Sequence, residues 1–340
     1  MAREDTADPV YSGRVLRGVT LGLVLAIALA GCRGVRPPSA GGSSTPELPP
    51  PLEDPNVSRI ELEADLRAGL LEAYAARSSG FDDAWLDLLL HAPRLLLIGV
   101  GVEDVIFGFS PGAASRNRPF SERPAEWVSK ALEVHVTKDG GAGWSVDEIS
   151  YRVDDPKGRA ILPLRETAVF ERGVGRWELV QDHLSYGAPL PDVVRMTGRR
   201  PPWKSVAAGA PDPASAELYK LLAAHLAGKA TIPAGADTVV LGPDSWKSWR
   251  GAEAPTGLGA VLGGEVTLEP GELRVQRARS GALGWGAGTV VATSEAYPMG
   301  VVLRVTWVVV PDGDGWRLAV LHVAPAFTRD ALRALVFGRG

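Results

Sequence analysis

The chain has 340 residues, more than one hydrophobic core usually organises, so two domains are the expected organisation. The composition, 45 % hydrophobic and 22 % charged, is that of a folded soluble protein. With 36 basic and 40 acidic side chains the net charge is -4, which provides no basic surface for a polyanion and disfavours nucleic-acid binding.

The N-terminal segment has the features of an export signal. Arg14 and Arg17 precede an apolar run over residues 19–30 that is too short to span the roughly 30 Å core of a membrane comfortably. The run ends in Leu29-Ala30-Gly31-Cys32, which resembles the lipobox of bacterial lipoproteins. The resemblance implies that residues 1–31 are a cleaved signal peptide and that Cys32 is lipidated. An uncleaved anchor and a plain secretory signal remain alternatives.

Cys32 is the only cysteine, so the chain can form no internal disulfide and its folding depends on core packing. The following residues up to 57 are rich in Pro, Gly and Ser and cannot bury a core, so residues 32–57 are predicted to be a disordered tether. We therefore expect a lipoprotein of the bacterial cell envelope. Acyl chains such as palmitate on Cys32 would hold it on the outer membrane or on a periplasm-facing membrane.

Residues 58–191 are predicted to form a first α+β domain. Apolar residues recur at helical spacing from Ile60 to Ala73, and a second helical stretch covers 82–90. A short strand ends at Gly108, and two long strands, Ala160–Arg172 and Trp177–Ser185, form a hairpin.

Residues 192–212 contain two proline pairs around an Ala-Gly stretch and are predicted to be a linker. The second domain, 213–340, has the same order of elements. A helix over 214–227 precedes a short strand ending at Gly242, and strands 300–310 and 316–324 form a hairpin closed by Asp312-Gly-Asp-Gly315.

The two halves also share sequence. Seven identities in twenty positions recur at an offset of 139: Leu164, Arg165, Thr167, Val169, Trp177, Leu179 and His183 match Leu303, Arg304, Thr306, Val308, Trp316, Leu318 and His322. An earlier block aligns at an offset of 134, where His91, Gly101, Val105 and Gly108 match His225, Gly235, Val239 and Gly242 in sequence. The tryptophan and histidine pairs carry more weight than the glycine and valine matches. A repeat of this length indicates two copies of one domain.

The run from Leu164 to Ser185 resembles the end of SnoaL-like domains in the nuclear-transport-factor-2-like superfamily. There a strand with an arginine and a threonine leads through a hairpin to a tryptophan and, six residues later, a histidine. The second half departs more, with Val323-Ala324 where the first has Leu184-Ser185.

The resemblance implies an α+β fold of two tandem cone-shaped domains. In each, a curved antiparallel sheet wraps around N-terminal helices and encloses a pocket. Relatives include ketosteroid isomerase-like and polyketide cyclase-like enzymes as well as proteins without catalytic activity. The resemblance also implies that the two domains pack as an intramolecular pseudo-dimer, like the homodimers of the family.

Side chains alternate along a strand, so Trp177 and His183 are predicted to share a face, as are Trp316 and His322. We expect these four residues to line the pockets. A pocket imidazole could act as a general base, but a buried structural histidine is the favoured interpretation.

Glu166 and Asp182 could supply a carboxylate to His183 in the first half. The residues 139 positions later are Val305 and Leu321, so the second half lacks both. The sequence therefore gives no confident catalytic residue, and the catalytic hypothesis is confined to the first half.

Other motifs add little chemistry. Arg165 and Arg304 could bind an anion, but an ion-pair or interdomain role is favoured. The run Gly108-Phe-Ser110-Pro-Gly112 fits a nucleophile elbow, yet Pro111 has no N–H to donate to an oxyanion, so a serine hydrolase is disfavoured. The sequence has no motif for a metal or a nucleotide cofactor.

Three function classes follow from these observations. The first, which we favour, is a non-catalytic lipoprotein that binds a small hydrophobic ligand or a protein. The alternatives are an isomerase-like or cyclase-like enzyme that acts on a small hydrophobic substrate in the first domain, and a structural component of the cell envelope.

Overall fold

The computed structural model describes residues 57–81, 85, 94–108, 119, 125–155, 158–197, 204–207 and 213–337. Cys32, the signal segment 1–31 and the tether up to residue 56 lie outside these residues, as do His91 and Ser110. Contacts group residues 49–340 into one compact unit. Within the described part of the chain, none of the helices has both the length and the apolar character needed to cross a membrane.

The first helix, α1 (Arg59–Ser78), begins at a capping box. The Ser58 hydroxyl accepts from the backbone N–H of Glu61 at 3.3 Å, and the Glu61 carboxylate accepts from the Ser58 N–H at 2.7 Å. Its buried side chains recur every three or four residues, so one face of the helix lies on the sheet. The predicted second helical stretch, 82–90, is described only at Trp85.

The first sheet has the strand order β2-β1-β7-β6-β5-β3, and β4 also pairs with β5. All of its pairs are antiparallel except β1 with β7. Helix α4 (Leu190–Thr197) follows the last strand and occupies the first residues of the predicted linker. The strands are β1 (Leu96–Ile98), β2 (Val105–Phe107), β3 (Ala125–Ser129), β4 (Glu133–Val136), β5 (Ala142–Asp155), β6 (Gly158–Arg172) and β7 (Trp177–Tyr186).

The second sheet has the order β10-β11-β12-β13-β8-β9, and only β8 with β13 is parallel. Its strands are β8 (Ala234–Leu241), β9 (Ser248–Arg250), β10 (Thr267–Arg277), β11 (Gly284–Ser294), β12 (Tyr297–Asp312) and β13 (Gly315–Pro325). The helices of the second half are the 3₁₀ turn η1 (Pro213–Ser215), α5 (Ala216–Leu226), α6 (Leu258–Leu262) and α7 (Arg329–Phe337).

The two sheets therefore share one topology, but the earlier repeat block was aligned wrongly. Leu96 pairs with Gln181 on the last strand of the first sheet, and Val239 pairs with Val320, which lies 139 positions after Gln181. Strand β1, not β2, thus corresponds to β8, and the match of Val105 with Val239 is wrong. The alignment rested on glycine and valine, which recur by chance in short buried strands.

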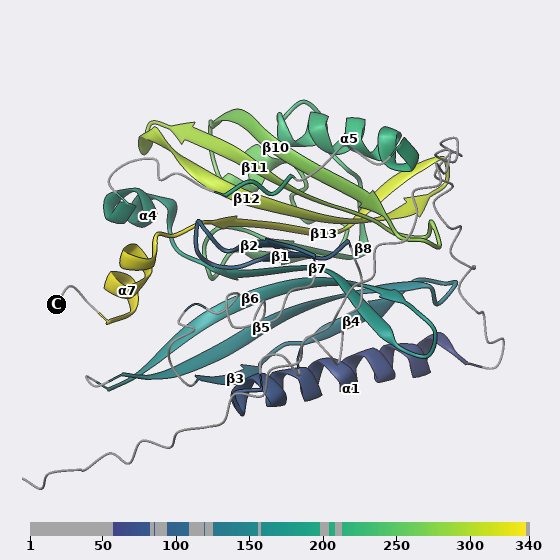
Figure 1. Cartoon of the computed structure of the whole chain (residues 1–340). Coiled ribbons are helices and arrows are strands. Elements are labelled where there is room, and N and C mark those ends of the chain that lie inside the picture. Colours follow the sequence, from purple (N-terminus) through teal and green to yellow (C-terminus); the bar gives the residue numbers. More distant parts are fainter. Residues whose placement is uncertain are drawn as a thin grey trace, which may run out of the picture. The chain divides into compact units, whose positions relative to one another are not determined.

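The prediction of a mixed α+β fold is confirmed. Helix α1 lies along one face of the first sheet, α5 lies along the second, and the opposite faces of the two sheets meet (Figure 1). Buried side chains of β1, β5, β6 and β7 form one core cluster there with side chains of β8, β11, β12 and β13. The cone-like wrapping of each sheet and the domain boundaries remain predictions.

Candidate functional site

A bulge in the last strand of each sheet turns the predicted pocket histidines away from the helices. Gln181 lies opposite Val169, but Leu179 lies opposite Phe170, so Val180 is an extra residue in β7. A shift of one residue reverses the face of every later side chain. Trp177 and Leu179 consequently pack in the cluster with α1.

The second sheet repeats this feature at Ala319, the residue 139 positions after Val180. The expectation that Trp177 shares a face with His183, and Trp316 with His322, is therefore wrong in both halves.

His183 and His322 meet between the two sheets. Their rings stack with centroids 4.1 Å apart and planes at 25°. Each Nδ1 lies 3.0 Å from the hydroxyl of a threonine on the opposite sheet, His183 from Thr306 and His322 from Thr167. The Nε2 of His322 also lies 2.7 Å from the Ser185 hydroxyl.

Burial controls the charge of this pair. It lowers the pKa of His183 to about 3, with a further contribution from the nearby positive charge of Arg304. It also lowers the pKa of His322 well below the ordinary value. Both imidazoles are thus neutral at neutral pH, and a group with so low a pKa is a poor proton acceptor there. The pair serves as an inter-sheet contact.

The two repeated arginines tie the sheets together. Arg304 donates to the backbone oxygens of Gly99 at 2.7 Å and Val102 at 2.8 Å. Arg165 donates to the backbone oxygen of Gly242 at 2.8 Å and to that of Ser245. Gly99 and Gly242 directly follow the corresponding strands β1 and β8, so the two contacts are symmetric. Both arginines thus make contacts between the two sheets, and their interdomain role remains a prediction.

The carboxylates of the first half lie on the other face of the sheet, under α1. Glu166 on β6 is paired with Asp147 on β5, and Asp182 on β7 is paired with Ala168, the next residue on this face of β6. All three carboxylates are buried, with exposures of 2 % or less. The sequence suggested Glu166 and Asp182 but gave no reason to add Asp147.

Helix α1 brings two polar side chains onto these acids. Tyr74 lies one turn after Leu70, and its hydroxyl donates to Glu166 Oε2. Arg77 is fully buried, and its Nη1 lies 3.9 Å from Glu166 Oε1. The guanidinium also lies over the rings of Trp127 and Trp85, at 3.6 and 4.5 Å from their centroids. An arginine on the apolar stripe of the helix was the signal that could have identified this contact.

These five residues, Tyr74, Arg77, Asp147, Glu166 and Asp182, are called the polar cluster below. Burial raises the pKa of Glu166 to about 7, although the charge of Arg77 and the Tyr74 hydroxyl oppose that shift. Burial also raises the pKa values of Tyr74 and Asp147. Glu166 Oε1 and Asp147 Oδ2 accept no hydrogen bond from any described residue. The polar cluster can therefore hold a proton near pH 7 and present an acceptor to a ligand.

The corresponding positions of the second half carry no charge. Gly288 pairs with Val305 as Asp147 pairs with Glu166, so glycine replaces this aspartate. A Cβ added at Gly288 would lie 3.1 Å from Leu226, which means that α5 packs directly on the strand. Valine 305 and Leu321 replace the other two acids, as the sequence predicted.

A tryptophan fills the same region of the second half. Trp307 lies 139 positions after Ala168 and is fully buried. Its indole N–H donates to His225 Nδ1 at 3.1 Å, and His225 Nε2 lies 2.5 Å from the Thr256 carbonyl oxygen. Among the described residues the sheet face under α1 has only the methyl group of Ala168 at this position. The two halves thus share a fold but differ in what lies beneath the helix.

No group of three or more His, Cys, Asp or Glu side chains in the described ranges has the arrangement of a metal site.

Comparisons with known proteins found one family match and several similar solved structures. Residues 68–189 match the family profile described as SnoaL-like domain. An NTF2-like superfamily protein of Salmonella enterica serovar Typhimurium is 15 % identical, with a TM-score of 0.34, over 39 % of this chain and 96 % of that one. An NTF2-like protein of unknown function from Pseudomonas putida is 16 % identical, with a TM-score of 0.30, over 36 % and 84 %.

A Caulobacter vibrioides protein with a cystatin-like fold is 14 % identical, with a TM-score of 0.30, over 37 % of this chain and 89 % of that one. The comparison with curated proteins gave no match. The profile match includes Tyr74, Arg77 and the three acids of the polar cluster. Residues 68–189, in the first half of the chain, are thus similar to SnoaL-like domains.

Proposed function

We propose that the first half binds a small, largely apolar molecule under α1, at the polar cluster, and that the second half is a partner without a ligand site. The observation that carries this proposal is the contrast at one position, where Ala168 lies beside buried acids and Trp307 fills the second core. Burying several acids lowers the stability of the folded protein, and buried acids with shifted pKa values cluster at functional sites.

The surroundings define the ligand chemistry. Trp127 and Tyr151 lie edge to face with centroids 5.0 Å apart, and Trp127 also stacks on Tyr74 at 6.4 Å. These rings favour a flat apolar body. A hydroxyl or carbonyl group on that body would hydrogen-bond to Glu166 or Tyr74.

The test is calorimetric titration of the purified chain with 2-naphthol, a flat molecule with one hydroxyl group. We expect binding by the wild type, and no binding by Ala168→Trp, which places the second half's own residue in the site. Glu171→Gln is the matched control, because Glu171 is a buried glutamate of the same strand that contacts Arg94 and Arg279 instead.

Equal binding by Ala168→Trp would contradict the site. So would a large loss of thermal stability in that variant, because overpacking would show that the first core is already full.

A second candidate function is proton transfer, and the pKa of Glu166 favours it. A carboxyl group with a pKa of about 7 can both accept and donate a proton at neutral pH. The chain would then act as an isomerase-like enzyme on a small hydrophobic ketone. Deuterium exchange at the acidic carbon of 2-tetralone measures this activity, and exchange unchanged in Glu166→Gln would exclude Glu166 as the base.

We further propose that the protein is a lipoprotein of the bacterial cell envelope, attached to membrane lipid through acylated Cys32. The support is the sequence Leu29-Ala-Gly-Cys32 after a basic and then apolar segment. Mass spectrometry of the mature N-terminus tests the proposal, and an unmodified Cys32 would contradict it. We propose that in this protein the two halves form an intramolecular pseudo-dimer, with the ligand site under α1 of the first half.

A further inference from the structure

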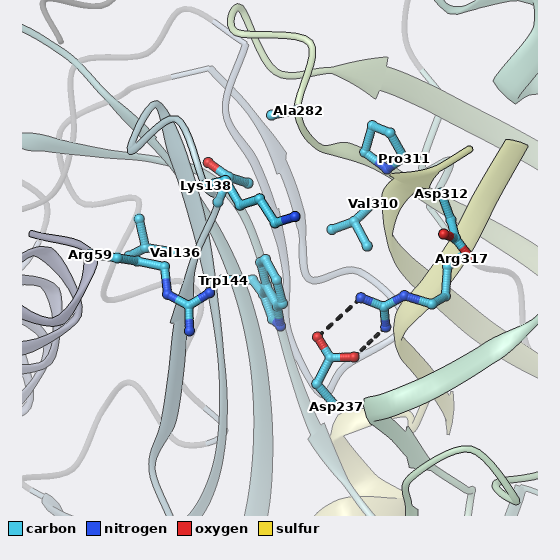
Figure 2. A pocket seen from close by; sticks show the side chains of 11 residues that line it. Arg59, Val136, Lys138, Trp144, Asp237, Ala282, Val310, Pro311, Asp312 and Arg317 are labelled. Atoms are coloured by element: carbon cyan, nitrogen blue, oxygen red, sulfur yellow. Dashed lines mark hydrogen bonds and ion pairs between the residues drawn. The ribbon is translucent and has the colours of Figure 1, made fainter. Parts of the chain in front are cut away.

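A cavity lies between the two sheets, separate from the polar cluster. It has a volume of about 360 Å³, and both halves line it. Arg59, Lys138 and Trp144 come from the first half, and Asp237, Val310 and Arg317 from the second (Figure 2). This cavity is called the seam pocket below. A volume of this size, at an interface of two domains, fits a small organic molecule.

The seam pocket has an excess of positive charge. Its lining includes three cationic side chains and two acids, Asp237 and Asp312. Arg317 holds Asp237 through both carboxylate oxygens, with one contact of 3.2 Å, and so neutralises it. Asp312 is exposed at the end of β12. Arg317 and Asp237 therefore occupy each other, and Arg59 and Lys138 are the remaining cations of the lining.

Lys138 is the cation best placed for a ligand. It lies in the turn between β4 and β5, and Figure 2 shows its ammonium group extending across the pocket toward Val310 and Trp144. In the described part of the chain Lys138 takes part in no ion pair, whereas Arg59 pairs with Glu63 at 3.3 Å. An ammonium group without a fixed partner can accept an anionic group from solution.

Trp144 supplies an unused donor. Its side chain is 4 % exposed and lines the pocket, and its ring stacks on His135 with centroids 5.1 Å apart. No described residue accepts a hydrogen bond from its indole N–H. A buried donor of this kind is normally paired, so an acceptor within the pocket would complete it.

The second half shows that a buried indole N–H without an acceptor does not by itself indicate a ligand site. Trp285 pairs with Val308 as Trp144 pairs with Val169, so the two tryptophans correspond. The N–H of Trp285 also lacks an acceptor among the described residues, yet the ring is fully buried and lines no described cavity. The donor, the ammonium group and the open volume coincide at Trp144.

We propose that the seam pocket binds a small carboxylate with a flat apolar body. Its acid group lies against Lys138, with Arg59 nearby, and its body lies between Trp144 and Val310. A carboxylate oxygen, or a second acceptor on the ring, receives the indole N–H. This site does not depend on the ligand proposed under α1.

The experiment is calorimetric titration of the full chain with 2-naphthoate, with 2-naphthamide as its uncharged counterpart. We expect 2-naphthoate to bind with 1:1 stoichiometry and at least tenfold more tightly than the amide. Lys138→Gln should weaken naphthoate binding about tenfold, since the exposed side chain can be replaced without disturbing the core. Lys130→Gln, an exposed lysine outside the pocket, should leave the affinity unchanged.

Trp144→Phe removes the donor but keeps a ring, and it should weaken binding severalfold. Ala168→Trp, which blocks the site under α1, should leave naphthoate binding unchanged. The proposal is overturned if naphthoate fails to bind at millimolar concentration or if Lys138→Gln binds like the wild type. It is also overturned if Ala168→Trp abolishes naphthoate binding, because the ligand would then occupy the polar cluster.

Discussion

Replacing Glu166 by glutamine should change how the stability of the protein depends on pH. The pKa of Glu166 is about 7 in the folded protein, against an ordinary value of 4.5. The folded state therefore holds a proton that the unfolded state has lost between these two values. Stability from this group is present below pH 4.5 and is lost as the pH rises to 7. A difference of about 2.5 pKa units corresponds to about 3 kcal/mol.

Glutamine at this position can still accept the Tyr74 hydroxyl, but it cannot ionise. Urea unfolding at pH 5 and pH 8 should therefore show Glu166→Gln gaining about 2.5 kcal/mol relative to the wild type between the two values. At pH 8 the variant should be the more stable protein. Glu171→Gln, which breaks contacts with Arg94 and Arg279, should be less stable than the wild type at that pH. If both variants lose stability at pH 8, the reasoning about Glu166 is refuted.

Two further predictions concern the contact between the sheets. The pKa of His183, about 3 when folded, lies below its ordinary 6.5, so its stabilising contribution is present above pH 6.5 and is lost as the pH falls. Between pH 6.5 and pH 5 the wild type should lose about 2 kcal/mol of unfolding free energy from His183. Urea titrations in which His183→Gln loses as much stability as the wild type over this range would refute the contribution of His183. Arg304→Met leaves the oxygen of Gly99 without its donor and that of Val102 with only the backbone N–H of Lys204, so it should cost about 2–4 kcal/mol, whereas the surface variant Arg152→Met should cost less than about 1 kcal/mol. Equal unfolding midpoints for the two arginine variants would contradict the role of Arg304.

The sequence predicts the parts of the fold that repeat over long strands. The pairs Trp177 with Trp316 and His183 with His322 locate the final hairpin of each half, and both hairpins are present. The absence of counterparts to Glu166 and Asp182 in the second half could also be predicted, because the gapless alignment of the hairpins pairs every residue with one counterpart. Strong patterns over twenty positions leave little freedom of register.

The faces of the histidines could not be predicted, because they depend on one extra residue. Leu179 and Val180 are both buried and apolar although they lie on opposite faces of the sheet, so no change in alternation marks the bulge. The short strands were misaligned for a related reason. Three or four apolar residues before a glycine fit both β1 and β2, and only the parallel pairing with β7 decides between them.

Only part of the polar cluster could be predicted from the sequence. Glu166 and Asp182 lie on the repeated hairpin, but Asp147 comes from β5 and Tyr74 from α1. Their proximity is set by the packing of the helix on three strands, which a single sequence does not encode locally. Arg77 follows Tyr74 by three residues on an apolar helix face. A buried arginine at such a position indicates a polar contact beneath the helix.

The central claim is that the first half keeps a ligand site where the second half is filled. A crystal structure of the protein soaked with 2-naphthol tests it most directly. We expect density for the ring system beside Ala168, with its hydroxyl within hydrogen-bond distance of Glu166 or Tyr74, and none beside Trp307. Side chains that fill the space around Ala168 and leave no density for the probe would contradict it.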